Sequence, residues 1–281
     1  MKPIPNKKPQ GQYGIIGWPL GHTKSPLLHN WGLKESGLPG TYVAWPTEPG
    51  NKLKAFLAEV RVRRIKGVSV TIPHKQTVIP FLDGLTERAK AVGAVNTLFW
   101  REGKLLGDNT DVDGIVAPLE AHREALKSAL VLGAGGAARA ACAALKALNV
   151  ADIAVANHTP GKALGLARDF GIRAVPWDER AASVWSLIVN ATPLGTTGEH
   201  VNESPWPQDG FKDVSLVFDM VYNPVRTRLI QDAQAAGVAC VSGQSMFLHQ
   251  GLAQFEIWTG KRLDEKRARQ LLMADMALTG A

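Results

Sequence analysis

The sequence predicts an α/β protein of two domains, the second of which contains a parallel sheet. Strand-like and helix-like patterns alternate along most of the chain, as is typical of parallel sheets whose strands are joined by helical crossovers. A glycine-rich turn at Gly133 follows an apolar strand pattern and precedes a long alanine-rich helix pattern. The chain has 281 residues, a length that fits two compact domains of ordinary size.

The first domain is expected to mix strands and helices. Runs of β-type residues predict strands at 13–18, 41–45 and 67–72 and a hairpin at 97–100 and 104–106. Apolar residues at helical spacing predict helices at 25–35, 51–63, 75–82 and 86–92. Ser25 is expected to be the N-cap of the first helix, because its hydroxyl can accept a hydrogen bond from a helix N–H and Pro26 suits the first helical position.

A helix at 112–126 is expected to bridge to the second domain, which is expected to open with a buried strand at 129–132 and a long alanine-rich helix. Further strands are predicted at 153–156, 174–176, 187–190, 216–220 and 238–241. Two helices, at 246–258 and 264–278, follow with no strand left to pair, so they are expected to pack back on the first domain. The predicted domain limits are 1–115 completed by 247–281, and 116–246.

Composition argues against several classes of protein. Hydrophobic residues make up 45% of the chain and charged residues 20%, a globular balance, and no apolar run approaches the ~18 residues that span a membrane. Residues 1–12 are polar and are expected to form a flexible leader, not a signal peptide. The net charge is +7, but the cations are scattered, which favours anionic small molecules over nucleic acid or a membrane as partners.

The two cysteines predict a reducing environment. Cys142 falls in a helix pattern and Cys240 in a strand pattern, and core packing explains both. We therefore expect a cytoplasmic protein without disulfides. No cysteine or histidine spacing typical of a metal site occurs in the sequence, so no metal is expected.

The glycine-rich turn predicts a dinucleotide site in a Rossmann-type second domain. Its residues, Gly133-Ala134-Gly135-Gly136-Ala137-Ala138, match the G-x-G-x-x-G/A pattern between a strand and a helix. Gly133 permits the tight turn, Gly135 lets the backbone approach a pyrophosphate, and Ala138 keeps the helix close to the sheet. The alternative is a plain strand-to-helix turn, and the surrounding βα alternation argues against it.

The end of the next strand predicts which dinucleotide binds. A carboxylate there accepts from the ribose of NAD, whereas cationic groups suit the 2′-phosphate of NADP. The strand ends in Asn157, His158 and Thr159, with no carboxylate, and Lys162 follows at the next helix start. We therefore expect these four residues to hold the 2′-phosphate of NADP, with helix capping by Thr159 as the alternative.

Polar segments of the first domain carry residues that packing does not require. Thr23 and Ser25 stand at the start of a helix, where two hydroxyls and helix N–H groups can bind a carboxylate. Thr71 and Lys75 lie toward the end of a strand and beyond it, on the side where ligands bind to open α/β sheets.

Two further residues are expected to converge on Lys75. Asn96 and Asp111 stand in polar segments around the predicted hairpin. A carboxylate beside a lysine in a cleft holds its ammonium group in place and can bring it into the range of acid/base catalysis. The sequence therefore predicts an acid/base site built on Lys75 and Asp111.

The chain resembles the shikimate dehydrogenase family in a series of motifs that follow the family's order and spacing from about Tyr13 to the final helix. Those of the first half are Gly-x-Pro-x-x-His-Thr-x-Ser-Pro-x-x-His-Asn from Gly17, Val-Thr-Ile-Pro-His-Lys from Val70, Gly-Ala-Val-Asn-Thr-Leu from Gly93 and Asn-Thr-Asp from Asn109. Those of the second half are Gly-Ala-Gly-Gly-Ala-Ala-Arg from Gly133, Asn-Ala-Thr-Pro-Leu-Gly from Asn190, Asp-Met-Val-Tyr-Asn-Pro from Asp219 and Gly-Gln-Ser-Met-Phe-Leu-His-Gln-Gly from Gly243.

The resemblance implies reversible NADPH-linked reduction of 3-dehydroshikimate to shikimate, in aromatic amino-acid biosynthesis, with Lys75 and Asp111 as the catalytic pair. The substrate-binding residues that it implies are Thr23, Ser25, Thr71, Lys75, Asn96, Asp111, Tyr222 and Gln250. The cofactor-binding residues that it implies are Gly133, Ala134, Gly135, Gly136, Ala137, Ala138, Asn157, His158, Thr159, Lys162, Thr192, Met220, Gly243 and Met246. A monomer or homodimer is expected.

Three residues depart from the family pattern. Thr23 stands where serine is common, Ser69 where asparagine precedes Val-Thr, and His158 where arginine is usual. Two alternatives therefore stay open: a quinate/shikimate dehydrogenase of the same family using NAD, and a non-catalytic homologue that senses a cyclic acid or a dinucleotide. The presence of Lys75 and Asp111 argues against a sensor.

Overall fold

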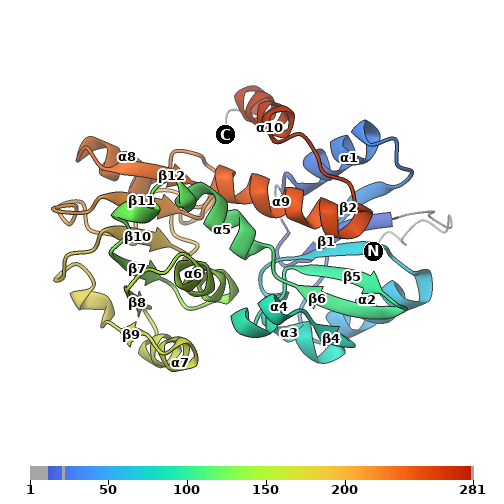
Figure 1. Ribbon diagram of the computed structural model, residues 1–281, viewed down its shortest axis with the longest axis horizontal. Helices are drawn as coiled ribbons and strands as arrows, with labels where there is room; N and C mark the ends of the chain where they lie inside the picture. Colours follow the sequence, from blue (N-terminus) through green and yellow to red (C-terminus); the bar gives the residue numbers. More distant parts are fainter. Residues whose placement is uncertain (1–11, 21–22, 280–281) are drawn as a thin grey trace. The chain divides into compact units, whose positions relative to one another are not determined.

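The computed structural model describes residues 12–20 and 23–279, which fold into two compact α/β units (Figure 1). The first unit contains the described residues up to 90, together with 95–108 and 251–274, and the second contains 91–94, 109–250 and 275–279. Each unit has one six-stranded sheet, so the predicted α/β class with two domains is confirmed. The domain limits drawn from the sequence stay a prediction. Residues 1–11 of the expected leader and residues 21–22 of the first motif lie outside the described residues.

The sheet of the first unit has the strand order β2-β1-β3-β5-β6-β4. Its strands are β1 (Gln12–Gly17), β2 (Thr41–Pro46), β3 (Gly67–Val70), β4 (Gly84–Leu85), β5 (Thr97–Arg101) and β6 (Lys104–Asp108). β1, β2 and β3 are parallel, and β5 and β6 form the predicted hairpin, in which Glu102 and Gly103 have φ of 52° and 76°. Positive angles at both central residues are typical of a two-residue hairpin turn. The sequence does not predict β4, because two residues are too few to show alternation.

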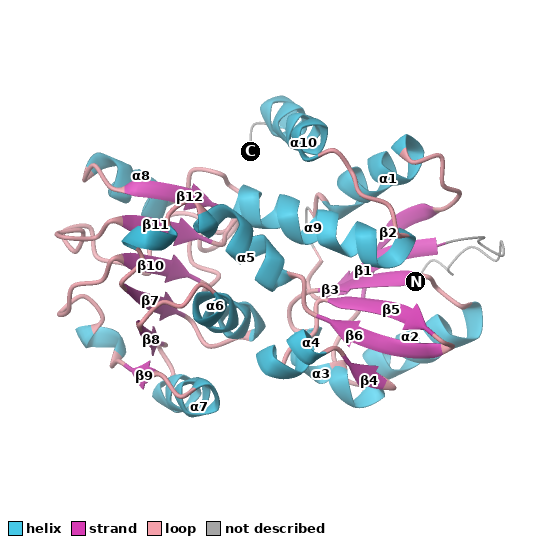
Figure 2. Ribbon diagram, in the orientation of Figure 1, coloured by secondary structure: helices cyan, strands magenta, loops and turns pink. Residues whose placement is uncertain are grey.

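Helices cover both faces of this sheet (Figure 2). Ile16 of β1 packs with Leu57 of α2 (Asn51–Arg63) on one face. Its neighbour Ile15 packs on the opposite face with Leu33 of α1 (Ser25–Glu35) and Phe255 of α9 (Gly243–Thr259). Short helices follow β3: α3 (His74–Thr77), η1 (Ile79–Phe81) and α4 (Glu87–Val92). The single helix predicted at 75–82 is therefore two pieces.

The C-terminal helices pack on the first unit, as predicted. Trp258 of α9 donates from Nε1 to the carbonyl oxygen of Leu98 at 2.9 Å. A Cβ added at Gly67 would lie 2.5 Å from the Trp258 ring, so only glycine leaves room for the indole. Arg267 of α10 (Glu265–Thr279) forms an ion pair with Glu35 of α1.

All strands of the second sheet are parallel, in the order β12-β11-β10-β7-β8-β9. They are β7 (Ser128–Leu132), β8 (Asp152–Ala156), β9 (Arg173–Ala174), β10 (Leu187–Asn190), β11 (Leu216–Asp219) and β12 (Ala239–Ser242). The chain starts at the central strand β7, builds outward through β8 and β9, then returns to build the other half. That is the order of the Rossmann fold, so this prediction is confirmed.

Helices pack on both faces of the second sheet as well. They are α5 (Asp111–Glu120), η2 (Arg123–Ala125), α6 (Gly136–Ala147), α7 (Pro160–Phe170), η3 (Trp177–Glu179) and α8 (Arg228–Ala235). Val131 of β7 shares a core with Ala141 of α6 and Leu166 of α7, whereas Leu130 shares the opposite core with Ile230 of α8. No helix within the described part of the chain is both long enough and apolar enough to span a membrane.

Candidate active site

Three predicted site residues gather where β3 of the first unit ends. The Thr71 N–H donates to the carbonyl oxygen of Ile16 at 2.9 Å, which ties it to the neighbouring strand. Asn96 accepts from the Val70 N–H through its carbonyl oxygen at 2.7 Å, and the Lys75 carbonyl oxygen accepts from the Val95 N–H at 2.7 Å. These backbone bonds bring Thr71, Lys75 and Asn96 to the carboxyl edge of the sheet, where ligands bind in α/β folds.

A buried histidine positions the short helix that carries Lys75. His74 opens α3, is fully buried, and donates from Nε2 to the carbonyl oxygen of Thr47 at 2.7 Å. Since Thr47 follows β2, this bond anchors α3 to the loop beyond that strand. His74 is therefore a structural residue that supports Lys75, which itself is half-buried.

Thr23 and Ser25 place two hydroxyls side by side at the start of α1. Thr23 Oγ1 donates to Ser25 Oγ at 3.2 Å and accepts from the Ser25 N–H at 3.3 Å. The predicted N-cap role of Ser25 is wrong: Ser25 is the first helical residue, Lys24 occupies the N-cap position, and no side chain caps the helix. Because Thr23 takes the Ser25 N–H, both hydroxyls lie next to the helix N-terminus, a position that favours an anion.

Asn96 lies in a buried polar cluster that the sequence does not predict. Its carbonyl oxygen accepts from Gln254 Nε2 of α9 at 2.9 Å, and its side-chain Oδ1 accepts from Thr97 Oγ1 at 2.7 Å. Gln254 Oε1 in turn accepts from Ser69 Oγ at 2.8 Å. Ser69, where the resemblance predicts asparagine, therefore supports the Asn96 segment through Gln254.

Asp111 is the first residue of α5 in the second unit and is buried. Its N–H donates to Asn109 Oδ1 at 3.1 Å, and Asn109 Nδ2 donates to the carbonyl oxygen of Ala94 at 2.9 Å. The helix dipole favours a carboxylate at this position. Asp111 thus belongs to the second unit and Lys75 to the first.

The predicted dinucleotide turn has the geometry of a phosphate-binding loop. Gly133 has φ 112°, a backbone conformation that residues with a side chain rarely adopt. A Cβ there would also lie 2.9 Å from the carbonyl oxygen of Ala191, so only glycine fits. A Cβ at Gly135 would meet no heavy atom within 4 Å, so the backbone is open on that side. Ala138 is fully buried, which lets α6 pack closely on the sheet.

The predicted 2′-phosphate residues lie where β8 ends. Asn157 Nδ2 donates to the carbonyl oxygen of Thr159 at 3.1 Å, and the Lys162 N–H donates to the same oxygen at 3.1 Å. Thr159 is the N-cap of α7, but its side chain makes no capping hydrogen bond. Helix capping therefore does not account for the Thr159 hydroxyl, and His158 and Lys162 are both exposed.

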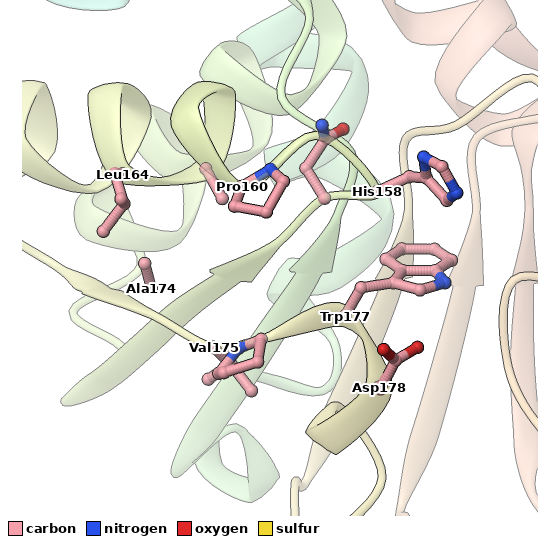
Figure 3. Close-up of a pocket in the computed structure, with 10 residues that line it drawn as sticks. His158, Pro160, Leu164, Ala174, Val175, Trp177 and Asp178 are labelled. Atoms are coloured by element: carbon pink, nitrogen blue, oxygen red, sulfur yellow. The ribbon is translucent and has the colours of Figure 1, made fainter.

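A pocket of about 340 Å³ opens beside these residues (Figure 3). Its lining includes Asn157 and His158 after β8 and Trp177 and Asp178 after β9. Figure 3 shows the rings of His158 and Trp177 at one end of the pocket. The Arg180 guanidinium lies over the Trp177 ring, 4.3 Å from its centroid, and helps to hold the indole in place. Trp177 and Asp178 belong to none of the motifs that predict a binding site in the sequence.

A buried carboxylate organises the ends of β10 and β11. Asp219 Oδ1 accepts from Asn190 Nδ2 at 2.9 Å, and Asn190 Oδ1 accepts from the N–H and the hydroxyl of Thr192 at 2.9 and 2.7 Å. These bonds hold Thr192 beside the end of β10. Met220 follows Asp219 directly, and its N–H donates to the Asn190 carbonyl oxygen at 3.0 Å. Burial raises the pKa of Asp219 to about 6, although hydrogen bonds from Thr227, the Val221 N–H and Asn190 oppose the shift.

The remaining predicted residues of the second unit cluster where β12 meets α9. A Cβ at Gly243 would lie 2.6 Å from the Met220 carbonyl oxygen, so the two segments approach closely. Tyr222 stacks on Phe247 with ring centroids 5.0 Å apart, and Gln250 Nε2 donates to the Phe247 carbonyl oxygen at 2.9 Å. Met246, from the same turn of α9, is buried in the core.

Among the described residues, no group of three or more His, Cys, Asp or Glu side chains could hold a metal ion. The first unit therefore offers hydroxyls, an amide and one lysine at the edge of its sheet, and the second unit offers one buried aspartate and the glycine turn. Such groups can bind a polar substrate and transfer a proton.

The chain matches family models near both ends. Residues 15–98 match the model described as shikimate dehydrogenase substrate binding domain, and residues 243–273 match the one described as shikimate 5′-dehydrogenase C-terminal domain. The first match covers the segments that carry Thr23, Ser25, Thr71, Lys75 and Asn96. The second covers Gly243 to Gln250.

Whole-chain comparisons agree with the family models. A protein of Maridesulfovibrio salexigens named shikimate dehydrogenase (NADP(+)) is 49% identical over 266 residues, which cover 95% of this chain and 97% of that protein. The crystal structure of shikimate 5-dehydrogenase from Thermus thermophilus in complex with NADP(H) and shikimate is similar with a TM-score of 0.85 at 37% identity, covering 94% and 99% of the two chains.

A structure with a different cofactor is also similar. Quinate dehydrogenase from Corynebacterium glutamicum in complex with NAD has a TM-score of 0.83 at 30% identity, covering 94% of this chain and 99% of that one. Two relatives of different specificity thus share the fold. Because the Maridesulfovibrio protein aligns with this chain over nearly its whole length at 49% identity, the chain belongs to the shikimate dehydrogenase family.

Proposed function

We propose that this chain catalyses the reversible NADPH-linked reduction of 3-dehydroshikimate to shikimate, the step of the shikimate pathway that leads toward chorismate and the aromatic amino acids. The observation that carries the proposal is the gathering of Thr71, Lys75 and Asn96 at the carboxyl edge of one sheet. The name of the Maridesulfovibrio relative and the shikimate and NADP(H) of the Thermus structure support the same substrate and cofactor.

Substrate recognition is proposed to begin at the carboxylate. The hydroxyls of Thr23 and Ser25, 3.2 Å apart at the start of α1, suit an anion because the helix N-terminus lies next to them. Thr71 and Asn96 are proposed to bind ring hydroxyls. Asp111, Tyr222 and Gln250 of the second unit are proposed to bind the same substrate.

Lys75 is proposed to transfer the proton. Reduction of a ketone requires hydride on carbon and a proton on oxygen, and bound NADPH supplies the hydride. The Lys75 ammonium would donate to the developing alkoxide, and the neutral amine would take the proton back in the direction of oxidation. Asp111 is proposed as the second member of the catalytic pair, accepting a hydrogen bond from a ring hydroxyl.

The glycine turn fits the cofactor that this reaction needs. The open space over Gly135 suits a pyrophosphate, and the first N–H groups of α6 would donate to it. Asn157, His158, Thr159 and Lys162 are proposed to bind the 2′-phosphate. The residues proposed to border the nicotinamide and its ribose are Thr192, Met220, Gly243 and Met246.

The adenine is proposed to occupy the pocket beside His158. An adenine ring is flat and largely apolar on its faces, and the indole of Trp177 offers it a stacking surface. The neighbouring Asn157 and Lys162 would then meet the phosphate on the adenosine ribose. This arrangement gives a reason for the pocket to adjoin the end of β8.

One assay tests the proposed function. Nicotinamide absorbance is followed with shikimate and with quinate, each with NADP+ and with NAD+. We expect the highest kcat/KM for shikimate with NADP+. Activity with quinate and NAD+ alone would favour a quinate dehydrogenase, a second candidate raised by the similarity to the Corynebacterium enzyme. No activity with any pair would favour a non-catalytic sensor.

We further propose a cytoplasmic location and a monomeric or homodimeric state. Both cysteines are free, and burial raises the pKa of Cys142 to about 12, so its thiol stays protonated and unreactive. Two unpaired cysteines suit a reducing compartment. Fractionation of cells tests the location, and light scattering after gel filtration tests the oligomeric state.

A further inference from the structure

We infer that Gln254 is a positioning residue for substrate binding, because it orients the side chain of Asn96 through a buried chain of hydrogen bonds. The inference rests on the proposed function, in which Asn96 binds a ring hydroxyl of the substrate. Gln254 lies on α9 and is 1% exposed, so no solvent contact explains a polar residue at this position. Buried amides are kept where their hydrogen bonds are needed.

The chain of hydrogen bonds joins five buried residues of the first unit. Tyr42 Oη lies 2.6 Å from Ser69 Oγ, which lies 2.8 Å from Gln254 Oε1. Gln254 Nε2 lies 2.9 Å from the Asn96 carbonyl oxygen and 3.0 Å from Thr97 Oγ1. Thr97 Oγ1 completes the chain, 2.7 Å from Asn96 Oδ1.

The direction of every bond in this chain follows from one carbonyl group. The Asn96 carbonyl oxygen can only accept, so the Gln254 amide must turn its nitrogen toward it and its oxygen toward Ser69. Ser69 must then donate to Gln254 and accept from the Tyr42 hydroxyl. On the other side, the second hydrogen of Gln254 Nε2 occupies the acceptor of Thr97 Oγ1, which leaves the Thr97 hydrogen for Asn96 Oδ1.

This direction decides how Asn96 meets a ligand. An asparagine amide can turn over and exchange its oxygen and nitrogen at small cost when nothing distinguishes them. Here the Thr97 hydrogen selects the oxygen, so Asn96 acts toward the substrate as a donor through Nδ2. Without Gln254 the Thr97 hydroxyl could rotate, and the Asn96 amide could present its oxygen to the substrate instead.

The direct test is Gln254→Met, which keeps the length of the side chain and removes its hydrogen bonds. We expect the KM for shikimate to rise about tenfold, as is usual when a polar contact with a substrate hydroxyl is weakened. The KM for NADP+ and kcat should stay within about twofold, because neither depends on Asn96 in this scheme. A wild-type KM for shikimate in this variant would overturn the inference.

A second variant covers the case in which Gln254→Met does not fold. Thr97→Val keeps the shape of the side chain and removes only the hydroxyl that links Gln254 to Asn96 Oδ1. It should raise the KM for shikimate by a similar factor of about ten. Tyr42→Phe is the matched control, since it removes only the hydroxyl at the far end of the chain and should leave that KM within about twofold.

Two comparisons separate positioning from general destabilisation. Leu57→Ala weakens the core of the same unit away from the chain, so it should lower the melting temperature without raising the KM for shikimate. Asn96→Ala combined with Gln254→Met should give the KM of Asn96→Ala alone, whereas multiplied effects would show that Gln254 does not act through Asn96.

The proposed function and this inference fail in different ways. A wild-type protein that does not turn over shikimate with either dinucleotide contradicts the proposed function. A wild-type protein that turns over shikimate, beside Gln254→Met and Thr97→Val variants of unchanged KM, contradicts only the positioning role of Gln254.

Discussion

Asn190 and Asp219 end two neighbouring parallel strands and bond side chain to side chain, with Asn190 Nδ2 donating to Asp219 Oδ1 across 2.9 Å. Both residues are fully buried. Asp219 also accepts from Thr227 Oγ1 at 2.5 Å and from the Val221 N–H at 3.0 Å. Burial nevertheless dominates and raises the pKa of Asp219 to about 6. The carboxylate that organises the cofactor side of the second unit therefore titrates near neutral pH.

This raised pKa predicts how stability depends on pH. Because the pKa in the folded state lies above the ordinary value, the folded protein binds the proton more tightly than the unfolded chain does. Stability should fall as the pH rises from about 4 to about 6 and stay lower above it. Asp219→Asn cannot titrate. The free energy of unfolding of the variant minus that of the wild type should therefore rise by about 2 kcal/mol between pH 4 and pH 7, because the unfolded carboxyl is already partly ionised at pH 4.

Urea unfolding of both proteins at pH 4, 5, 6 and 7 measures that difference. Asp209→Asn, at an exposed position, controls for the loss of one negative charge. If the difference between wild type and Asp219→Asn were the same at every pH, Asp219 would not be the titrating group. Thermal melts at the same pH values provide a second measurement.

The sequence predicts the strands and helices well where many residues share one pattern. A parallel sheet is predicted by the apolar runs of β7, β8, β10 and β11 and by the glycine turn before α6. The structure contains that sheet. β4 lacks such a pattern because it has two residues and exists through its pairing with β6. The helix predicted at 75–82 is divided because Pro80 has no N–H to continue α-helical bonding.

The hydrogen-bonded networks could not be predicted, since they depend on register and on long-range contacts. Asn190 faces Asp219 only because β10 and β11 pair with that register. Gln254 lies 185 residues from Ser69 along the chain, so no local pattern connects them. A glutamine directly before the buried Phe255 of α9, as Gln254 is, is the signal that could have drawn attention. It identifies no partner by itself.

Trp177 provides the next prediction, because it lines the pocket proposed for the adenine. Trp177→Ala should raise the KM for NADP+ and for NAD+ by about tenfold each, since stacking on an aromatic ring does not depend on the 2′-phosphate. Trp177→Phe keeps an aromatic face and should stay within about threefold of wild type. The KM for shikimate should not change. Unaltered KM values for both dinucleotides in Trp177→Ala would place the adenine elsewhere.

Lys162 is predicted to distinguish the two dinucleotides. Its ammonium group is proposed to pair with the 2′-phosphate, which NAD+ lacks. Lys162→Ala should raise the KM for NADP+ about tenfold and leave the KM for NAD+ within about twofold, as expected for the loss of one charge-assisted contact. Lys146→Ala, at an exposed position in the last turn of α6, is the matched control and should change neither value. Equal effects on both dinucleotides would remove Lys162 from the phosphate site.

Lys75 is predicted to act in the chemical step. Removing a positioned acid/base group slows a reaction by about 100- to 10,000-fold, so Lys75→Ala should lower kcat within that range. The KM for shikimate should rise by no more than about threefold, because a group that acts mainly in the transition state adds little to ground-state binding. Steady-state kinetics with saturating NADP+ measures both quantities. Lys66→Ala, an exposed lysine of the same unit, controls for the lost charge, and added primary amines should restore part of the turnover of Lys75→Ala alone. Near-normal turnover in Lys75→Ala would require another proton donor.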